Sequence, residues 1–364
     1  MKGIGNPTSA SNRLGLDYRA EAARLGAAPK PIIDVHTHIN GTRAAEIYRD
    51  VCDVFGVCRT YSQTRLDGAE KVRSILGDRI RFIAVPDFMS DDKAYAFREG
   101  FLENVQAFHE RFGSRIVKFW AAPRFRDYIE ELGSDDVIAM DSPWRVRVAE
   151  LAQSLGMMFM THVGDPDTWF STKYADASVY GTKSQQYVAF ERMLDRFSSP
   201  WIAAHMGGWP ENLGFLSGLL SRHDNLYLDT SATKWMVREL GRHERAELLE
   251  FFTRWKGRIL FGSDIVTSDD HLHTGPSESP MSALAGDERS AFDLYASRYW
   301  ALRTLFETDY DDQSPIADPD LMMCEPERYH EMSAPRLRGK HLPHDLLAGL
   351  YHDAATDLLD PIHE

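Results

Sequence analysis

Two histidines one residue apart follow an apolar run in the segment PIIDVHTHIN, residues 31–40. If this run is a β-strand, His36 and His38 project from the same face, because side chains alternate along a strand. Two imidazoles side by side at the end of a strand could bind a metal ion. A single histidine at such a place more often makes a structural hydrogen bond, so the pair needs partners elsewhere in the chain.

Three further polar residues end apolar runs: His162 in FMTHVGD, His205 in IAAHMGG and Asp264 in LFGSDI. Imidazole and carboxylate are the nitrogen and oxygen ligands that Zn²⁺ prefers, and a catalytic zinc keeps one position open for water. Asp264 follows Gly-Ser, so it could instead cap a turn. The joint pattern predicts a divalent metal site, with zinc as the expected ion.

Eight short β-rich segments are expected to be strands, with helical patterns between several of them. The expected strands are 31–36, 54–60, 80–85, 115–120, 157–162, 200–205, 225–230 and 258–263, and the expected helices include 92–112, 142–155 and 184–197. This alternation predicts an α/β fold, a (β/α)8 TIM barrel, whose usual size is about 250 residues. In such a barrel the carboxyl ends of the strands form one mouth, where the histidines and Asp264 would meet.

The segments outside these strands suggest a domain organisation. Residues 1–30 are a polar stretch, expected to be an N-terminal extension, and 31–364 are expected to form the barrel. Residues 265–342 are rich in Asp, Ser, Pro and His and are expected to be an insertion after strand eight, with one helix at 288–307. It either caps the mouth or forms a loop excursion, and the final helix, 343–359, is expected to close the barrel. The HLH sequence at 271–273 lies in polar surroundings and is expected to be an exposed loop.

Composition limits the partners of the 364-residue chain. The net charge of −14 argues against binding to a nucleic-acid backbone, and no apolar run has membrane-spanning length. Three cysteines do not make a disulfide framework, which fits a reducing compartment. We therefore expect a cytoplasmic protein with a small-molecule substrate and with neither a nucleic-acid nor a membrane partner. A homo-oligomer is compatible with the sequence.

Lys118 interrupts the apolar run RIVKFW of the fourth expected strand. It could face the helix layer or pair with an acidic neighbour. If it faces the mouth instead, carboxylation of its amine by CO₂ would make it a ligand that bridges two metal ions. The expected metal content is therefore one ion, or two if Lys118 is carboxylated.

Four tryptophans follow expected strand ends: Trp120, Trp169, Trp209 and Trp235. They either pack loops onto the helix layer or face the mouth, where they would form a broad apolar surface for a flat ring. Arg124 could pair bidentately with a substrate carboxylate. These residues predict a cyclic or aromatic substrate that carries an acid group.

Taken in order, these motifs resemble the amidohydrolase superfamily, in particular the amidohydrolase-related branch that includes aminocarboxymuconate-semialdehyde decarboxylase. The matching residues are His36-Thr-His38, His162, His205 followed by Gly207-Gly208, YLDTSA at 227–232, Ser263-Asp264, and the terminal LPHDLLAGLYHDAATDLL at 342–359. The resemblance runs from about residue 31 to 264 and resumes at 343–359. It implies a divalent metal, usually zinc, held by His36, His38, His162 and Asp264, with His205 as a nearby acid or base. Binuclear amidohydrolases use the position of Lys118 for a carboxylated lysine.

The leading functional expectation is metal-dependent hydrolysis of an ester, lactone or amide bond of a cyclic or aromatic acid. Asp264 would take a proton from the attacking water and deliver it to the leaving group. His205 would stabilise the developing oxyanion or orient the substrate. One alternative is non-oxidative decarboxylation at the same metal, and another is a barrel that binds a ligand without catalysis.

Overall fold

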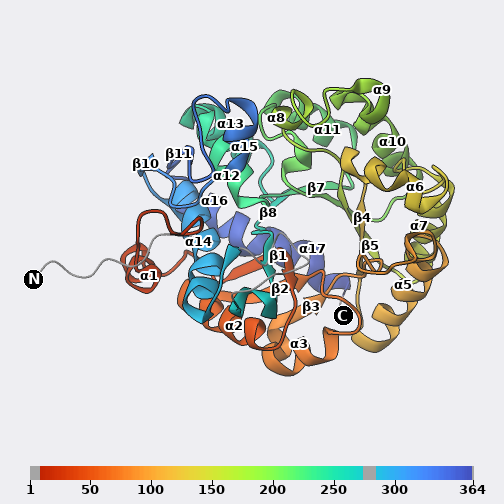
Figure 1. The fold of residues 1–364 in the computed structure, drawn as a ribbon, viewed down its shortest axis with the longest axis horizontal. Helices are drawn as coiled ribbons and strands as arrows, with labels where there is room; N and C mark the ends of the chain where they lie inside the picture. Colours follow the sequence, from red (N-terminus) through yellow and green to blue (C-terminus); the bar gives the residue numbers. More distant parts are fainter. Residues whose placement is uncertain (1–8, 274–283, 363–364) are drawn as a thin grey trace, which may run out of the picture.

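The computed structural model describes residues 9–273 and 284–362, in which strands lie inside a ring of helices (Figure 1). The strands are β1 (Ile32–Ile39), β2 (Val57–Ser62), β3 (Ile80–Phe82), β4 (Ile116–Trp120), β5 (Met158–His162), β6 (Trp201–Ala203), β7 (Leu226–Asp229), β8 (Ile259–Leu260), β9 (Ile265–Thr267), β10 (Asp311–Gln313) and β11 (Arg336–Arg338). Each of the eight expected strands overlaps one of β1 to β8, which confirms the predicted α/β barrel architecture.

Most helices follow strands and cover the outside of the barrel. They are α1 (Tyr18–Leu25), α2 (Arg43–Phe55), α3 (Ala69–Leu76), α4 (Lys93–Ala96), α5 (Glu99–Phe112), α6 (Ile129–Leu132), α7 (Pro143–Ser154), α8 (Asp167–Phe170), α9 (Ala177–Tyr180), α10 (Lys183–Arg196), α11 (Leu213–Arg222), α12 (Thr233–Glu239), α13 (Arg245–Arg254), α14 (Glu288–Glu307), α15 (Pro319–Cys324), α16 (His344–Ala348) and α17 (Ala354–Leu359). The second strand begins later than expected because α2 continues to Phe55, and the expected helix 92–112 is divided into α4 and α5.

Nine of the strands form two parallel sheets, in the orders β3-β2-β1-β9 and β4-β5-β6-β7-β8, and β10 pairs with β11 in an antiparallel sheet. Backbone hydrogen bonds join the sheets between β3 and β4. The amide of Ala84 donates to the carbonyl of Ile116 at 2.8 Å, and the amide of Lys118 donates to the carbonyl of Ala84 at 2.9 Å. These bonds continue the parallel pairing from one sheet to the next.

A second seam joins the sheets between β1 and the end of β8. The amide of Val35 donates to the carbonyl of Phe261 at 2.9 Å, and the amide of Asp264 donates to the carbonyl of His36 at 2.8 Å. Two of the predicted metal ligands therefore meet at this seam, one from each sheet.

The C-terminal segment fills the interior of the barrel. Ala355 and Leu359 of α17 pack in one buried cluster with Ile33 of β1, Met160 of β5 and Ile202 of β6. Figure 1 shows this segment running behind the strands, in the middle of the ring. Burial of one leucine side chain contributes about 1.5–3 kcal/mol, so this contact closes one end of the barrel firmly.

The expected single helix at 343–359 is instead interrupted by a π-helical turn, Gly349–Asp353, between α16 and α17. The carbonyl of Leu350 in this turn accepts a hydrogen bond from the amide of Phe261 at 3.1 Å. The turn thus connects the helix to the end of β8, a contact that helical periodicity alone does not indicate.

The described part of the predicted N-terminal extension packs on the barrel rather than lying outside it. The Asn12 side chain is fully buried and donates to the Asp293 carboxylate of α14 at 2.9 Å. Tyr18 of α1 is buried beside Trp300 of α14, with ring centroids 6.3 Å apart. Residues 9–30 are therefore part of the folded unit, because buried side chains of this segment contact α14.

The expected insertion 265–342 also contributes to the barrel. Its first residues form β9, which pairs with β1, and α14 confirms the helix expected at 288–307 and packs against α1, α2 and α12. His271 is fully buried with its Nδ1 2.9 Å from the Tyr295 hydroxyl, so the HLH segment is not the exposed loop that its composition suggested.

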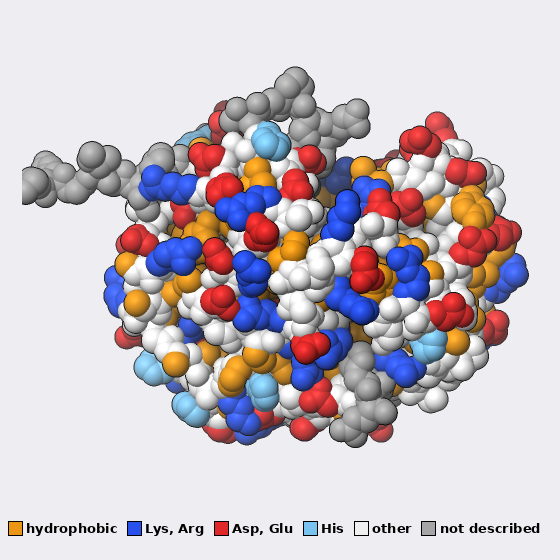
Figure 2. All heavy atoms as spheres, turned by 90° about the horizontal axis from the view of Figure 1, so that it is seen from below, with side chains coloured by type: hydrophobic (Ala, Val, Ile, Leu, Met, Phe, Trp, Pro, Cys, Tyr) orange, Lys and Arg blue, Asp and Glu red, His pale blue; other side chains and the backbone are white. Residues whose placement is uncertain are grey.

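Lysine, arginine, aspartate and glutamate side chains intermingle on the face drawn in Figure 2. Within the described residues, no helix combines the length and apolar character needed to cross a membrane.

The turn after β6 leads to a prediction about stability. Gly208 has φ +77°, and a Cβ there would lie 2.0 Å from the carbonyl oxygen of Gly164. Gly208→Ala should lower the free energy of unfolding by more than the roughly 1–3 kcal/mol that a left-handed backbone costs a non-glycine residue. Gly257→Ala is the matched control, because Gly257 has φ +85° and open space around its Cα. Urea unfolding of both variants measures the difference, and equal losses would contradict the steric argument.

Candidate metal centre

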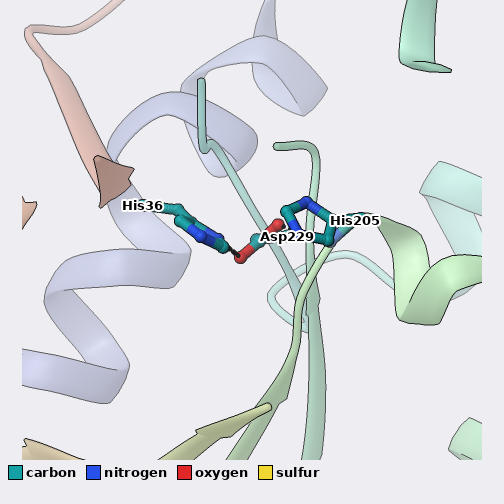
Figure 3. A group of neighbouring side chains, drawn as sticks. All are labelled: His36, His205 and Asp229. Atoms are coloured by element: carbon teal, nitrogen blue, oxygen red, sulfur yellow. Dashed lines mark hydrogen bonds and ion pairs between the residues drawn. The ribbon is translucent and has the colours of Figure 1, made fainter. Parts of the chain in front are cut away.

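His36, at the centre of β1, is held between a buried carboxylate and the cavity. Its Nδ1 lies 2.8 Å from Oδ2 of Asp229 and 2.9 Å from Oγ of Ser231. Figure 3 shows the Asp229 carboxylate between the rings of His36 and His205. Because Asp229 accepts the Nδ1 proton, Nε2 of His36 carries the lone pair, the form that binds a metal ion.

The other predicted ligands approach the same nitrogen. Oδ1 of Asp264 lies 3.4 Å from Nε2 of His36 and 3.1 Å from Nε2 of His38. The ligand atoms of these three residues all lie within 4.8 Å of one another. Two imidazoles and one carboxylate suit a divalent transition metal, so this donor set fits the predicted ion.

His36, His205 and Asp229 form a second group of possible ligands with equally close atoms. Both oxygens of the Asp229 carboxylate already accept hydrogen bonds from the protein, however. Oδ2 faces His36, while Oδ1 accepts the amide protons of His205 at 2.9 Å and Ser231 at 3.0 Å. Asp229 therefore orients the histidines, as carboxylates behind metal-bound imidazoles commonly do.

His162 lines the cavity but does not belong to the group formed by His36, His38 and Asp264. Its ring centroid is 4.6 Å from that of His205, and its Nε2 lies 2.9 Å from Oδ1 of Asp165. Asp165 in turn accepts a hydrogen bond from the Tyr174 hydroxyl at 2.7 Å. This leaves Nδ1 of His162 as the atom that could bind a metal ion.

Three residues that follow neighbouring strands have left-handed backbone conformations. His205 after β6, Ala232 after β7 and Asp264 after β8 have φ values of 60°, 61° and 60°. All three line the same cavity. Such a backbone costs a non-glycine residue roughly 1–3 kcal/mol, and residues of this kind gather at functional sites.

The cavity beside these residues has a volume of about 530 Å³ and opens at the carboxyl ends of the strands. Three of the predicted tryptophans, Trp120, Trp169 and Trp235, line it. Trp209 does not, because it stacks on Tyr187 with ring centroids 5.7 Å apart. An aromatic wall is therefore present, but it has three indoles rather than four.

Arg124 lies away from the cavity. Its guanidinium is more than half exposed and approaches Asp127 at 3.7 Å. The structure therefore does not bring Arg124 to the metal group, contrary to the expectation that it binds a substrate carboxylate. Arg124 lies in a short helical turn, Pro123–Tyr128, that follows β4.

Asp320 of α15 orients two of the tryptophans and was not predicted from the sequence. Its Oδ2 accepts hydrogen bonds from Nε1 of Trp169 at 2.9 Å and Nε1 of Trp235 at 3.1 Å. The carboxylate also lines the cavity. The segment expected to be an insertion thus holds the aromatic wall in place.

Lys118 faces the cavity, which is the orientation that carboxylation of its amine would require. It is buried, and its Nζ lies 3.0 Å from Nε2 of His36. Burial lowers the pKa of Lys118 to about 8, against the opposing charges of Asp229 and Asp264. A substantial fraction of the amine is therefore neutral near physiological pH, which is the form that reacts with CO₂.

Burial and neighbouring charges also shift the pKa values of His36, His205 and Asp264. Burial lowers the pKa of His36 and of His205, so both imidazoles are neutral. Burial alone would raise the pKa of Asp264, but the hydrogen bond from His38 and the nearby imidazoles bring it below its usual range. His36 and His205 thus present neutral imidazoles beside the ionised Asp264 carboxylate.

Asp34, two residues before His36, forms hydrogen bonds on both sides of the seam between β1 and the end of β8. Oδ1 accepts the amide protons of His36 and Ser263, each at 3.1 Å. Oδ2 accepts the hydroxyls of Ser263 at 2.5 Å and Tyr299 at 2.8 Å. Burial raises the pKa of Asp34 to about 7, partly offset by these hydrogen bonds. Asp34 therefore sets the distance between His36 and the loop that carries Asp264.

A protein-family model described as amidohydrolase matches residues 117–360, about two thirds of the chain. The chain belongs to the amidohydrolase family. It is therefore a metal-dependent enzyme, and the resemblance seen in the sequence is confirmed. A comparison of this amidohydrolase with curated proteins gives no match.

Solved structures similar to this amidohydrolase are distant. A 2,6-dihydroxybenzoate decarboxylase from Rhizobium is 12% identical and has a TM-score of 0.41, over 73% of this chain and 98% of that chain. A 5-carboxyvanillate decarboxylase from Novosphingobium aromaticivorans, complexed with manganese, is 10% identical with a TM-score of 0.37, over 76% and 97%. An N-acetyl-D-glucosamine-6-phosphate deacetylase from Mycobacterium smegmatis is 11% identical with a TM-score of 0.35, over 75% of each chain.

The sequence contained a partial signal for the site residues that prediction missed. Asp229 and Ser231 lie in YLDTSA, which carried the family resemblance but received no role. Asp34 lies in the same strand as His36 and reads as an ordinary polar residue of an apolar run. Asp320 lies in a polar segment with no strand before it, so nothing local distinguishes it.

The metal group leads to the second prediction. His36→Ala combined with His38→Ala should give a folded protein that retains less than about a tenth of the wild-type bound metal, because two of the three clustered ligand atoms are lost. Elemental analysis after dialysis measures the metal, and circular dichroism checks the fold. His330→Ala with His344→Ala is the matched control, since both side chains are exposed. Stoichiometric metal in the first double variant would contradict this site.

Proposed function

We propose that this amidohydrolase hydrolyses an ester, lactone or amide bond of a cyclic or aromatic acid. The observation that carries the proposal is the position of the His36, His38 and Asp264 group beside a cavity of about 530 Å³ with three indoles in its wall. The flat faces of the indoles suit a ring, and the metal-binding group beside them marks a place where a bond can be cleaved.

A divalent metal, expected to be zinc, would activate water and polarise the substrate carbonyl when bound. His36, His38 and Asp264 would hold it, and His162 would contribute through Nδ1. Oδ1 of Asp264 faces both histidines of β1, so Oδ2 is the oxygen available to accept a proton from the attacking water. The same carboxyl group would then protonate the leaving group.

The hydrogen bonds around His205 support an acid–base role for its ring. The Ser231 hydroxyl donates to Asp229, so its oxygen accepts the proton on Nδ1 of His205, 2.7 Å away. A neutral His205 then has a lone pair on Nε2. This nitrogen accepts protons or binds a second metal ion, and it can donate to an oxyanion only after it has been protonated.

A substrate screen tests the proposal. Aryl esters, lactones, aryl amides and aromatic carboxylates are incubated with the metal-loaded enzyme, and acid release and CO₂ release are measured together. We expect acid release from cyclic or aromatic substrates. CO₂ release without hydrolysis would favour the decarboxylase alternative, and binding without turnover would favour a non-catalytic barrel.

Asp264→Asn links any activity found to this site. The amide cannot accept a proton, so turnover should fall by roughly 100-fold or more while the fold is kept. Asp270→Asn is the matched control, since Asp270 is an exposed acid in the turn that follows β9. Near-normal turnover of Asp264→Asn would remove Asp264 from the mechanism.

The number of metal ions depends on Lys118. If its amine is carboxylated, added bicarbonate should raise the metal content from one ion towards about two per chain, as in two-metal hydrolases. The rise should be absent in Lys118→Ala, and short carboxylic acids should partly restore the activity of that variant. Mass spectrometry under native conditions reports the added CO₂. A constant single ion with an unmodified amine would establish the mononuclear arrangement.

A further inference from the structure

Two basic side chains outside the metal group line the same cavity. Lys234 is the second residue of α12, directly after β7, and Arg298 lies in the middle of α14. The two helices pack against each other. Both side chains are partly buried. The cavity therefore has a basic region that the metal-binding mechanism does not use.

Neither of these side chains has a carboxylate partner among residues 9–273 and 284–362. Nη1 of Arg298 donates only to hydroxyls, those of Ser297 at 2.8 Å and Ser11 at 3.4 Å. Arg238, one turn after Lys234, behaves differently, because it contacts the carboxylates of Asp318 and Asp320. The acidic groups of this region are thus already paired with Arg238.

Lys234 and Arg298 line one cavity, and the charge of Arg298 acts on Lys234. Burial lowers the pKa of Lys234, and the charge of Arg298 lowers it further, while Asp318 and Asp320 partly offset the effect. Burial also lowers the pKa of Arg298 to about 10. Like charges held together in a partly dry space are stabilised when an anion binds between them.

The cavity lacks the acidic excess of the protein as a whole. Its lining includes the basic residues Lys118, Lys234 and Arg298, and only Asp264 and Asp320 as acids among the described residues. The whole chain carries a net charge of −14. Lys234 and Arg298 therefore form a local basic region in an acidic protein, and a bound divalent cation would add to the attraction of the cavity for anions.

We propose that Lys234 and Arg298 bind a carboxylate group of the substrate that is not the group undergoing reaction. Arg298 offers a planar fork that matches a carboxylate, and Lys234 adds a point charge. The indoles of Trp169 and Trp235 line the same cavity, where the substrate ring would lie. The proposal rests on the proposed function for the reacting bond, and it defines the substrate as an acid whose free carboxylate faces α12 and α14.

Equilibrium binding tests this subsite without any need for turnover. The probes are isophthalate, which has two carboxylates on one ring, and its monomethyl ester, which has one. We expect the metal-loaded wild-type protein to bind isophthalate at least about tenfold more tightly by calorimetry, because charge-assisted hydrogen bonds are the strong ones. This preference should disappear in Lys234→Gln and in Arg298→Gln.

Two further variants control for folding and for general charge effects. Lys234→Arg should keep the preference, because the positive charge is retained. Arg124→Gln should keep it too, because Arg124 faces Asp127 outside the cavity. Thermal unfolding shows whether each variant is folded. The proposal is overturned if the wild-type protein shows no preference, or if the preference persists in both glutamine variants.

The subsite and the proposed reaction can fail separately. Hydrolysis of uncharged phenyl esters is measured on the same preparations. If the wild-type protein prefers isophthalate, the two glutamine variants lose that preference, and no preparation hydrolyses the esters, the subsite is supported and the reaction is rejected. Hydrolysis with no preference for isophthalate would reject the subsite alone.

Discussion

The metal group depends on the seam at which β1 meets the end of β8. His36 and His38 belong to the four-stranded sheet, whereas Asp264 follows the last strand of the five-stranded sheet. Their separation is therefore set by the backbone hydrogen bonds of the seam and by the Asp34 carboxylate, which accepts protons from both sides. A shift of one residue in this pairing would turn the histidines of β1 to the opposite face of the sheet.

Buried carboxylates set the geometry of the site without facing the reacting bond. Asp229 orients His36 and the turn that carries His205, and Asp34 fixes the loop before Asp264. Asp320 holds the indoles of Trp169 and Trp235. Each carboxylate accepts several hydrogen bonds, which offsets the cost of burying its charge. Such supporting groups keep the side chains in one orientation and so prepare the site for a ligand.

The site also uses backbone strain where strands end. The left-handed conformations of His205 and Asp264 lie in the segments that follow β6 and β8. The chain keeps these conformations because buried hydrogen bonds hold both sides of each turn. The amide of His205 donates to Asp229, and the amide of Asp264 donates to His36. Strain of this kind persists only where the surrounding structure is rigid.

By itself the sequence determined the strands of the barrel and the five polar residues at their ends, because strand alternation and position at a strand end are local properties. For Lys118 the sequence left two orientations open, towards the helix layer or towards the mouth of the barrel. Only the tertiary structure decided which aromatic and basic side chains reach the cavity. Trp209 and Arg124 follow strand ends yet turn away, whereas Arg298 comes from α14. Such contacts arise from the packing of segments that are distant in the chain, and no local pattern records that packing.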